Sequence, residues 1–417
     1  MTREHSRMSV QPGRAPSAFI GALALLWLLP SVAEAGLYTS PSGPTDNVGP
    51  ESAYMNPAGM TGVKTTALAA GVGGLIPVFK FSTEIAEAGG GDGGNSGVAS
   101  VLPSFYLVTP IADRFRLGFS VVSPVGGPDG LGWDFGDSWA GRYGSQGVTF
   151  ASTGFSLSGA WQVTDKWSLG VGGTANWLKA NLSAAVDTPF AGDAKADFQD
   201  LSDWSARYFV GTQYQVSPTT SLGLVYRSEW DSDVSGDRVD SGPNFPSITT
   251  PVTLNLVLPQ QVQFGIQQVL SKTLILGLNF DWTDWSEFEG IGVALSFENG
   301  AIKHGIFDIN WRDTYSVGAS LTHIAGGGRT FVNLGLDYSS SPVSDSNRII
   351  LLPLDESVTL SLGVAHNASK TLTYSLGGAV VFSGDADVDQ TSQGVRFKGD
   401  FDTNVAFVLG GSLQWRF

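Results

Sequence analysis

The chain ends in the stretch FDTNVAFVLGGSLQWRF, residues 401–417, in which apolar and small or polar side chains alternate. One side of an extended chain would carry the large apolar residues: Phe401, Val405, Phe407, Leu409, Leu413, Trp415 and Phe417. The other side would carry polar residues: Asn404, Ser412, Gln414 and Arg416. Because successive side chains of a β-strand point to opposite faces, this period of two predicts a long strand with one apolar face.

The same alternation recurs along the chain, whereas apolar stripes with the helical period do not. Clear examples are residues 371–382, 358–364, 314–321 and 155–163. The pattern predicts fourteen strand segments, near residues 65–76, 99–110, 114–124, 148–163, 166–184, 203–216, 219–232, 252–270, 273–298, 306–324, 329–340, 354–368, 371–384 and 400–417. The chain is therefore predicted to be all-β.

The connections between these segments alternate between tight turns and longer loops. Six are predicted to be tight: Ala112-Asp113, Thr164-Asp165, Ser217-Pro218, Ser271-Lys272, Ala325 to Gly328, and Ser369-Lys370. The others are generally longer and rich in Gly, Asp and Pro. Short turns on one side, long loops on the other and an even strand count are typical of bacterial outer-membrane barrels.

A soluble β-sandwich would also give each strand one apolar face. Two features favour a transmembrane antiparallel β-barrel: the alternating loop lengths, and aromatic residues at segment ends, where girdles at the lipid interfaces would lie. The tryptophans at these ends are Trp161, Trp167, Trp177, Trp204, Trp230, Trp282, Trp285, Trp311 and Trp415. Closure also removes the unpaired strand edges that lipid cannot hydrate.

Residues 1–35 are predicted to be a secretory signal peptide. Arg3, Arg7 and Arg14 precede an apolar run from Ala18 to Leu29, and a small-x-small cleavage pattern ends at Ala35. Pro30 ends the run well short of the roughly 20 residues of a membrane-spanning helix. The mature chain is therefore expected in the outer membrane of a Gram-negative cell.

The composition excludes several function classes. The chain has no cysteine, and its formal net charge of −15 argues against nucleic acid as a partner. The histidines after the signal, His304, His323 and His366, show no pair at metal-ligand spacing. No catalytic residue, metal site or cofactor is expected, and the protein is predicted not to be an enzyme.

Several motifs, in this order along the chain, resemble the FadL/TodX family of outer-membrane transporters. The first is Tyr54 to Met60, which contains Asn56-Pro57-Ala58. The others are Trp139 to Tyr143, Leu224 to Ser228, Leu258-Pro259-Gln260, Asp281 to Ser286 and Trp311 to Tyr315. Asn-Pro-Ala alone is a weak signal, but the ordered set spans residues 36–417.

The resemblance implies a fourteen-stranded barrel, residues 65–417, with a short N-terminal hatch inside the lumen, residues 36–64. Asn56, Pro57 and Ala58 would lie in this hatch, which is shorter here than in the best-known members. Members of the family carry long-chain fatty acids or hydrocarbons and release them sideways into the membrane beside a kinked third strand. Gly118 is the candidate for this kink, because glycine in a strand often marks a bend; an ordinary barrel glycine is the alternative.

The alternation of side chains predicts which charges face the lumen. Arg207 and Arg227 fall on the polar face of their segments, and lysine or arginine on a lipid face costs about 2–4 kcal/mol near the midplane. Together with the loop residue Arg142 they are candidates for binding a carboxylate head group. The favoured alternative is that these arginines pair with acidic side chains of the lumen and have a structural role.

The predicted function is an outer-membrane channel for hydrophobic small molecules, and the protein is expected to be a monomer in contact with outer-membrane lipids and lipopolysaccharide. A general or weakly selective diffusion porin is the first alternative. A structural or adhesive barrel, whose loops at 124–147 and 232–250 bind a partner, is the second.

Overall fold

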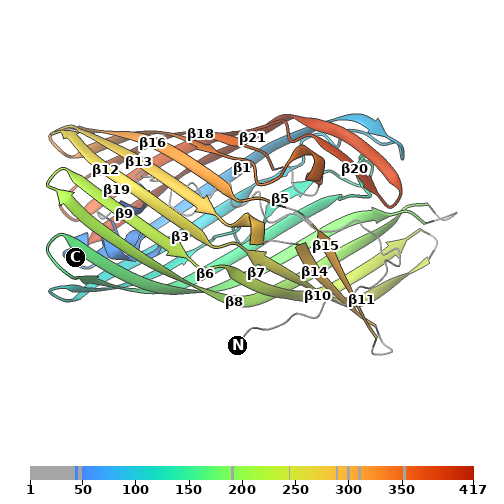
Figure 1. Ribbon diagram of the computed structural model, residues 1–417, viewed down its shortest axis with the longest axis horizontal. Helices are drawn as coiled ribbons and strands as arrows, with labels where there is room; N and C mark the ends of the chain where they lie inside the picture. Colours follow the sequence, from blue (N-terminus) through green and yellow to red (C-terminus); the bar gives the residue numbers. More distant parts are fainter. Residues whose placement is uncertain are drawn as a thin grey trace.

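The computed structural model describes residues 43–45, 49–188, 192–243, 245–287, 290–297, 301–308, 311–350 and 354–417. These residues form a closed antiparallel β-barrel with 14 strand positions (Figure 1). The barrel closes where β1 (Ala67–Ala86) pairs with β21 (Val395–Arg416), from Ala67↔Arg416 to Ala86↔Phe397. The predicted fold class is confirmed, whereas the predicted signal peptide, residues 1–35, lies outside the described residues.

Several strand positions are interrupted, so the described sheet holds 21 numbered strands. Besides β1 and β21 these are β2 (Gly97–Val98), β3 (Ser100–Ala112), β4 (Phe115–Val122), β5 (Leu131–Asp134), β6 (Gly147–Gln162), β7 (Trp167–Val186), β8 (Ala194–Ser217), β9 (Thr220–Arg227), β10 (Trp230–Gly242), β11 (Phe245–Leu258), β12 (Gln261–Ser271), β13 (Leu274–Thr283), β14 (Gly290–Ser296), β15 (Ile302–Asp308), β16 (Thr314–Ala325), β17 (Thr330–Ser339), β18 (Ser357–Asn367), β19 (Leu372–Ser383) and β20 (Val388–Ser392).

The helices among the described residues are short. They are η2 (Gly43–Thr45), α2 (Ser52–Met55), η3 (Pro57–Gly62), η4 (Trp285–Glu287) and η5 (Asp345–Asn347). A search of the described residues for a helix long and apolar enough to cross a membrane finds none.

All six predicted tight turns join neighbouring strands. The β3–β4 connection, for example, leaves two residues between Ala112 and Phe115, and the β12–β13 connection leaves two between Ser271 and Leu274. These turns gather at the end of the barrel that also holds the C-terminus, on the left of Figure 1. The longer connections and the ends of β10, β11 and β20 lie at the opposite end.

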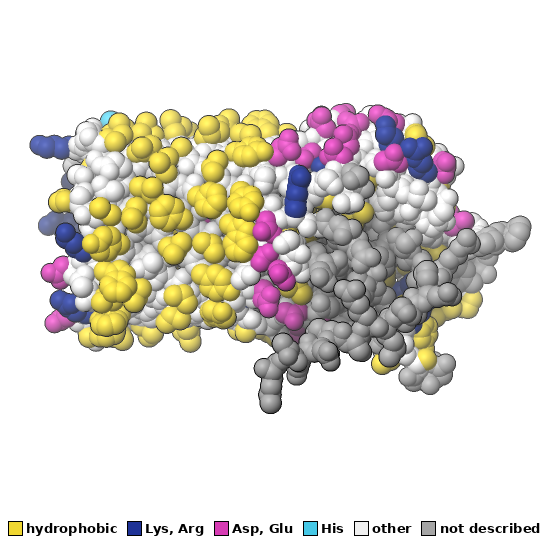
Figure 2. Space-filling view, viewed as in Figure 1, with side chains coloured by type: hydrophobic (Ala, Val, Ile, Leu, Met, Phe, Trp, Pro, Cys, Tyr) yellow, Lys and Arg dark blue, Asp and Glu magenta, His cyan; other side chains and the backbone are white. Residues whose placement is uncertain are grey.

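The outer surface of the barrel is apolar over the half nearer the short turns. On the face that Figure 2 shows, hydrophobic side chains are spread over this half and few charged ones lie among them, up to a row of Asp and Glu. Leu376 and Leu409 belong to this apolar surface and are 65% and 61% exposed, whereas a soluble protein would bury them. Such a band is what a bilayer requires of a transmembrane barrel.

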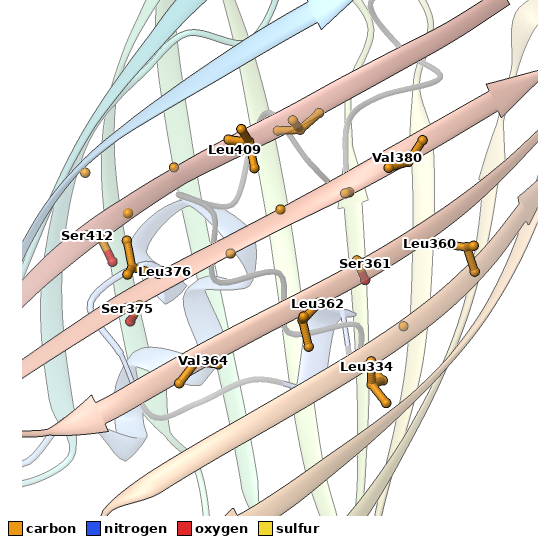
Figure 3. A pocket seen from close by; sticks show the side chains of 18 of the residues that line it. Leu334, Leu360, Ser361, Leu362, Val364, Ser375, Leu376, Val380, Leu409 and Ser412 are labelled. Atoms are coloured by element: carbon orange, nitrogen blue, oxygen red, sulfur yellow. The ribbon is translucent and has the colours of Figure 1, made fainter.

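Figure 3 shows part of this surface, a shallow apolar depression over β17, β18, β19 and β21. Leu334, Leu360, Leu362 and Leu409 stand beside it. Because these leucines point outwards, the depression faces lipid and is not part of a transport path through the lumen.

Two predicted orientations are wrong. Phe401 does not share the lipid-facing side of the last strand, because a register shift between the pairs Lys80↔Thr403 and Phe81↔Phe401 turns it inwards, where it is 1% exposed. One extra residue in a strand exchanges its two faces. Trp230, Trp285 and Trp311 are likewise buried and do not form part of an outer girdle.

Candidate functional site

Residues 49–63, here called the inner segment, lie against the inward faces of the barrel near the short turns, where Figure 1 draws them in dark blue. Ala53, Tyr54, Ala58 and Met60 are all fully buried. Ser158 of β6 donates a hydrogen bond of 2.9 Å to the carbonyl oxygen of Ala53. The inner segment is therefore bound to the wall of the lumen.

The predicted motif Asn56, Pro57 and Ala58 forms the bend between α2 and η3. Asn56 is extended, with φ −147° and ψ 105°, as expected for a residue before proline. Its Oδ1 accepts a hydrogen bond from the backbone N–H of Ala58, at 3.1 Å. Its Nδ2 donates to the carbonyl oxygen of Pro44, at 2.6 Å, and to that of Thr212 on β8, at 3.3 Å. Asn56 thus caps η3 and ties the bend to the barrel.

Glycines on the inward faces of neighbouring strands allow this close approach. A Cβ at Gly170 of β7 would lie 2.5 Å from the nitrogen of Ala58. One at Gly211 of β8 would lie 3.0 Å from Cδ of Pro57, and one at Gly223 of β9 would lie 2.6 Å from the carbonyl carbon of Pro44. Larger residues at these positions would displace the chain.

Gly118 is a fourth member of this row and is not a kink. It pairs with Val108 of β3 and Ser158 of β6 in an unbroken register. A Cβ there would lie 2.8 Å from Cβ of Ala53 and would also meet Sδ of Met60. The glycine is needed for contact with the inner segment, and the predicted bend at Gly118 is corrected accordingly.

The predicted lumen arginines Arg207 and Arg227 do face inwards, 4% and 1% exposed. Arg227 donates from Nη2 to the carbonyl oxygens of Tyr54 and Met55, both at 2.9 Å, and Arg207 donates to the hydroxyl of Tyr54. The Arg227 guanidinium also lies 4.8 Å from the centre of the Tyr54 ring. Both side chains hold the inner segment, and their role as head-group ligands stays a prediction.

Arg116 of β4 makes a similar contact. Its Nε donates to the carbonyl oxygen of Val63 at 2.7 Å, where the inner segment leads into β1. From the sequence, Tyr54 was noted only as the first residue of the family motif, and Arg116 was not singled out. Arg116 could have been, because it lies in the predicted segment 114–124 between the apolar residues Phe115 and Leu117.

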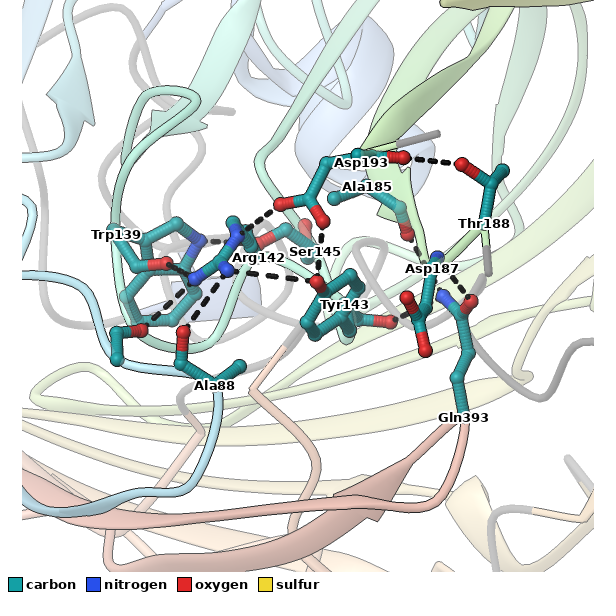
Figure 4. Close-up of polar contacts among 12 residues, drawn as sticks. Ala88, Trp139, Arg142, Tyr143, Ser145, Ala185, Asp187, Thr188, Asp193 and Gln393 are labelled. Atoms are coloured by element: carbon teal, nitrogen blue, oxygen red, sulfur yellow. Dashed lines mark hydrogen bonds and ion pairs between the residues drawn. The ribbon is translucent and has the colours of Figure 1, made fainter. Parts of the chain in front are cut away.

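The third predicted candidate, Arg142, lies in the connection between β5 and β6, far along the chain from the inner segment (Figure 4). Its Nε donates to Asp193 Oδ2 at 2.7 Å, and its Nη1 donates to the carbonyl oxygen of Gly89 at 2.9 Å. The hydroxyl of Tyr143 donates to the other oxygen of Asp193. Arg142, Tyr143 and Asp193 therefore join three connections at the long-loop end.

Burial, together with the hydrogen bond to Asp193, raises the pKa of Tyr143 to about 12. Burial alone would raise the pKa of Asp193, but the hydrogen bonds from Tyr143 and Arg142 outweigh it and hold that pKa below its ordinary value. Gln393 joins the same region from the β20–β21 turn, donating to the carbonyl oxygen of Ala185 at 2.7 Å. The β1–β2, β5–β6, β7–β8 and β20–β21 connections thus form one hydrogen-bonded layer.

The interior between this layer and the inner segment is apolar. A single cluster of buried hydrophobic residues extends from Leu75 of β1 to Val408 of β21. Its largest side chains are aromatic: Phe79, Phe81, Trp133, Phe135, Trp139, Phe150, Phe198, Trp230, Trp285, Trp311, Phe397 and Phe401. Inward-facing residues of an aqueous pore would be polar. This interior suits a hydrophobic solute.

The wall beside this interior is interrupted in the third strand position. β4 pairs with β6 as far as Val122↔Gly154, and β5 resumes at Leu131↔Phe150. Ser123–Gly130 therefore bulge opposite Ala151–Thr153, and the ladder between β3 and β4 ends at Phe105↔Val121. The interruption follows Val122, and the sequence SPVGGPDG at 123–130 could have signalled it.

The regions predicted as partner-binding loops also differ from expectation. The stretch 124–147 contains β5, which pairs with β6 and with β2, so it is part of the wall. Most of 232–250 belongs to the paired strands β10 and β11.

Comparisons with known proteins agree with this geometry. Residues 30–417 match the family model described as outer membrane protein transport protein (OMPP1/FadL/TodX). The chain is 24% identical over 319 residues to the long-chain fatty acid transport protein of Escherichia coli strain K12, covering 66% of this chain and 69% of the relative. It is 24% identical over 327 residues to outer membrane protein P1 of Haemophilus influenzae, covering 70% and 68%.

Solved structures share the fold. A Pseudomonas aeruginosa FadL homologue superposes with a TM-score of 0.81 at 19% identity, covering 93% of this chain and 98% of that one. The Ralstonia pickettii toluene transporter TbuX superposes with a TM-score of 0.68 at 18% identity, covering 92% and 97%.

Proposed function

The chain belongs to the OMPP1/FadL/TodX family of outer-membrane transport proteins. On this premise we propose that it carries long-chain fatty acids or hydrocarbons across the outer membrane and releases them sideways into the bilayer. The names of its relatives include both a long-chain fatty acid transport protein and toluene transporters. Those names suggest the substrate classes to be tested.

The proposed route begins at the long-loop end and continues through the apolar interior. The inner segment then acts as the hatch, because its residues are buried against β4, β6, β7, β8 and β9 at the short-turn end. A hydrophobic solute would gain nothing by passing this segment into periplasmic water. Direct transfer to lipid keeps apolar area out of water, which is worth about 25 cal/mol per Å².

One observation carries the lateral step: the third strand position is interrupted after Val122, beside the apolar band. Backbone that leaves a ladder at membrane depth is tolerated only where it lines a cavity or is covered by protein. Val125 satisfies this condition, since its N–H donates to Ser152 Oγ at 2.6 Å. The interruption is thus compatible with a membrane wall, and this supports it as the proposed exit from the apolar interior.

The uptake part is tested in a strain that lacks the gene, with and without the restored chain. We expect restoration to raise uptake of labelled oleate, a long alkane or toluene, while liposomes containing the purified protein stay impermeable to small sugars. Free passage of sugars, combined with uptake that does not depend on the protein, would instead support a diffusion porin.

The lateral part is tested in liposomes made with brominated lipids that quench a pyrene-labelled substrate, with albumin enclosed inside. If substrate leaves sideways, quenching by the lipid precedes capture by the albumin. Capture without prior quenching would show delivery to the aqueous side.

A further inference from the structure

The edge of β3 that faces the interruption carries a polar clamp. Both carboxylate oxygens of Asp129 accept a hydrogen bond from the backbone N–H of Val101, at 3.1 Å each. Ser100 Oγ donates to Asp129 Oδ1 at 3.0 Å. The ladder between β3 and β4 ends at Phe105↔Val121, so on this edge the Val101 N–H would otherwise have no strand partner. Val101 itself is 51% exposed.

The segment that carries Asp129 touches β3 at the same place. Gly127 donates its N–H to Ser100 Oγ at 2.9 Å, and a Cβ on Gly127 would lie 2.7 Å from the carbonyl carbon of Val101. Gly130 then donates to the carbonyl oxygen of Gly127 at 2.9 Å, which closes the turn that presents Asp129. One short turn, residues 127–130, therefore binds both Ser100 and Val101.

The next position on the same edge is Pro103. Alternate residues of a strand direct their N–H groups to the same side, and Val101 directs its own towards Asp129. Pro103 has the matching parity but no N–H, so it leaves no donor unpaired. At about 3.3 Å per residue, the stretch from Val101 to Phe105, where pairing with Val121 begins, is about 13 Å long.

These features suit an edge that must stay open. Proline and charged side chains are the means by which proteins prevent an exposed strand edge from pairing. A bare N–H facing acyl chains is unfavourable, and an ionisable residue beside lipid is rare unless it has a role. Without Asp129, the turn at 127–130 would keep only its contact with Ser100 Oγ and could move across the bare edge.

We propose that Asp129 is a positioning residue of the lateral exit: it binds the Val101 N–H and Ser100 hydroxyl, and so fixes the border of the opening nearer the long-loop end. The inference rests on the proposed function, because it concerns the shape of the exit through which substrate would leave.

The test uses the full barrel in liposomes, with pyrene-labelled fatty acid as the probe. We expect Asp129→Ala to lower the rate of transfer to lipid severalfold while the barrel stays folded. Asp129→Asn should have a smaller effect, because its amide oxygen still accepts from Val101 but its NH₂ cannot accept from Ser100. Asp165→Ala is the matched control, since that side chain lies in a short turn and is 93% exposed.

Amide hydrogen exchange gives a readout that does not depend on transport. In Asp129→Ala the Val101 amide should exchange at least about tenfold faster, as expected for the loss of hydrogen bonds to a charged acceptor. Amides in the β3–β4 ladder, such as that of Leu107, should be unchanged. Ser100→Ala removes the second anchor of the turn and is expected to act in the same direction should Asp129→Ala fail to fold.

The outcomes separate the two hypotheses. If the unmodified chain does not transfer this probe and also fails to raise uptake of an alkane or toluene, the proposed function is wrong whatever Asp129 does. If it transfers the probe and the Asp129 and Ser100 variants match it in transfer and in Val101 exchange, the role of Asp129 is overturned.

Discussion

Gly170 lies where the backbone of Pro57 and Ala58 comes closest to β7. An alanine there would place its Cβ 2.5 Å from the nitrogen of Ala58 and from the carbonyl carbon of Pro57, so the inner segment must shift. Overpacking of this kind typically costs about 1–3 kcal/mol. We expect Gly170→Ala to raise the conductance of the protein in planar bilayers, because a displaced inner segment blocks the lumen less.

Gly159→Ala is the control for this prediction, since nothing lies within 4 Å of a Cβ at that position of β6. It should leave the conductance unchanged. An equal rise in both variants would mean that the strand, and not the inner segment, responds to the substitution.

Arg227 offers a second test at the residue scale. Arg227→Met removes the hydrogen bonds to the carbonyl oxygens of Tyr54 and Met55, and hydrogen bonds to charged groups are worth about 1.5–3 kcal/mol. The inner segment should then become more sensitive to chymotrypsin at Tyr54, which is fully buried in the intact protein. Arg227→Lys should restore part of the protection, because lysine keeps the charge but not the geometry of the guanidinium. If cleavage at Tyr54 were unchanged in Arg227→Met, Arg227 would not be holding the inner segment in place.

The sequence predicted the inward orientation of Arg207 and Arg227 but not their partners. Orientation follows from side-chain parity along one strand, which is a local property. The partners are the Tyr54 side chain and backbone carbonyl groups of the inner segment, more than 150 positions away along the chain. No pattern of residue types marks a carbonyl as the acceptor for a distant arginine, so the choice between a head-group role and a structural role stayed open.

At the scale of elements, period-two alternation located the fourteen strand positions and the six tight turns, because lipid on one side and the lumen on the other impose it on every strand. It failed where the backbone departs from regular pairing. The register shift beside Phe401 exchanges the inward and outward faces in the N-terminal part of β21. The bulge at Ser123–Gly130 resembles a loop in sequence, since its two prolines and three glycines are turn residues.

The long-loop end supplies a prediction for pH. The pKa of Asp193 is lowered in the folded protein, so its contribution to stability is present above the unfolded pKa, about 4, and is lost as pH falls through the folded value. The pKa of Tyr143 is raised to about 12, so it stays a donor throughout the neutral range. The difference in unfolding temperature between the unmodified chain and Asp193→Asn should therefore be constant above about pH 5 and should shrink as pH falls from about 5 to about 3. A difference that is constant with pH would show that the carboxylate charge is not its source.

The acidic side chains are unevenly distributed along the long axis of the barrel. On the face that Figure 2 shows, most Asp and Glu side chains lie in a row at the border of the apolar band and beyond it towards the long-loop end, whereas Lys and Arg lie at both ends. The chain carries a formal net charge of −15 in total. Two of the cations at the long-loop end, Arg142 and Arg348, are paired with Asp193 and Asp355. We therefore expect a solute that approaches from the long-loop end to meet a negative potential.

The excess of acidic side chains towards the long-loop end predicts how the charge of a solute affects its entry. Like charges repel over about 30 Å at 0.01 M salt but over only about 8 Å at 0.15 M, so added salt should relieve the repulsion of an anionic substrate. In liposomes of neutral lipid, uptake of a fatty acid anion should rise severalfold over this range, whereas uptake of the fatty alcohol of equal length should not change. The alcohol is the matched control because it shares the apolar chain and lacks the charge. If uptake of both compounds rose equally, salt would be acting on the lipid or on the apolar interior. The acidic side chains at the entrance would then not contribute to selectivity.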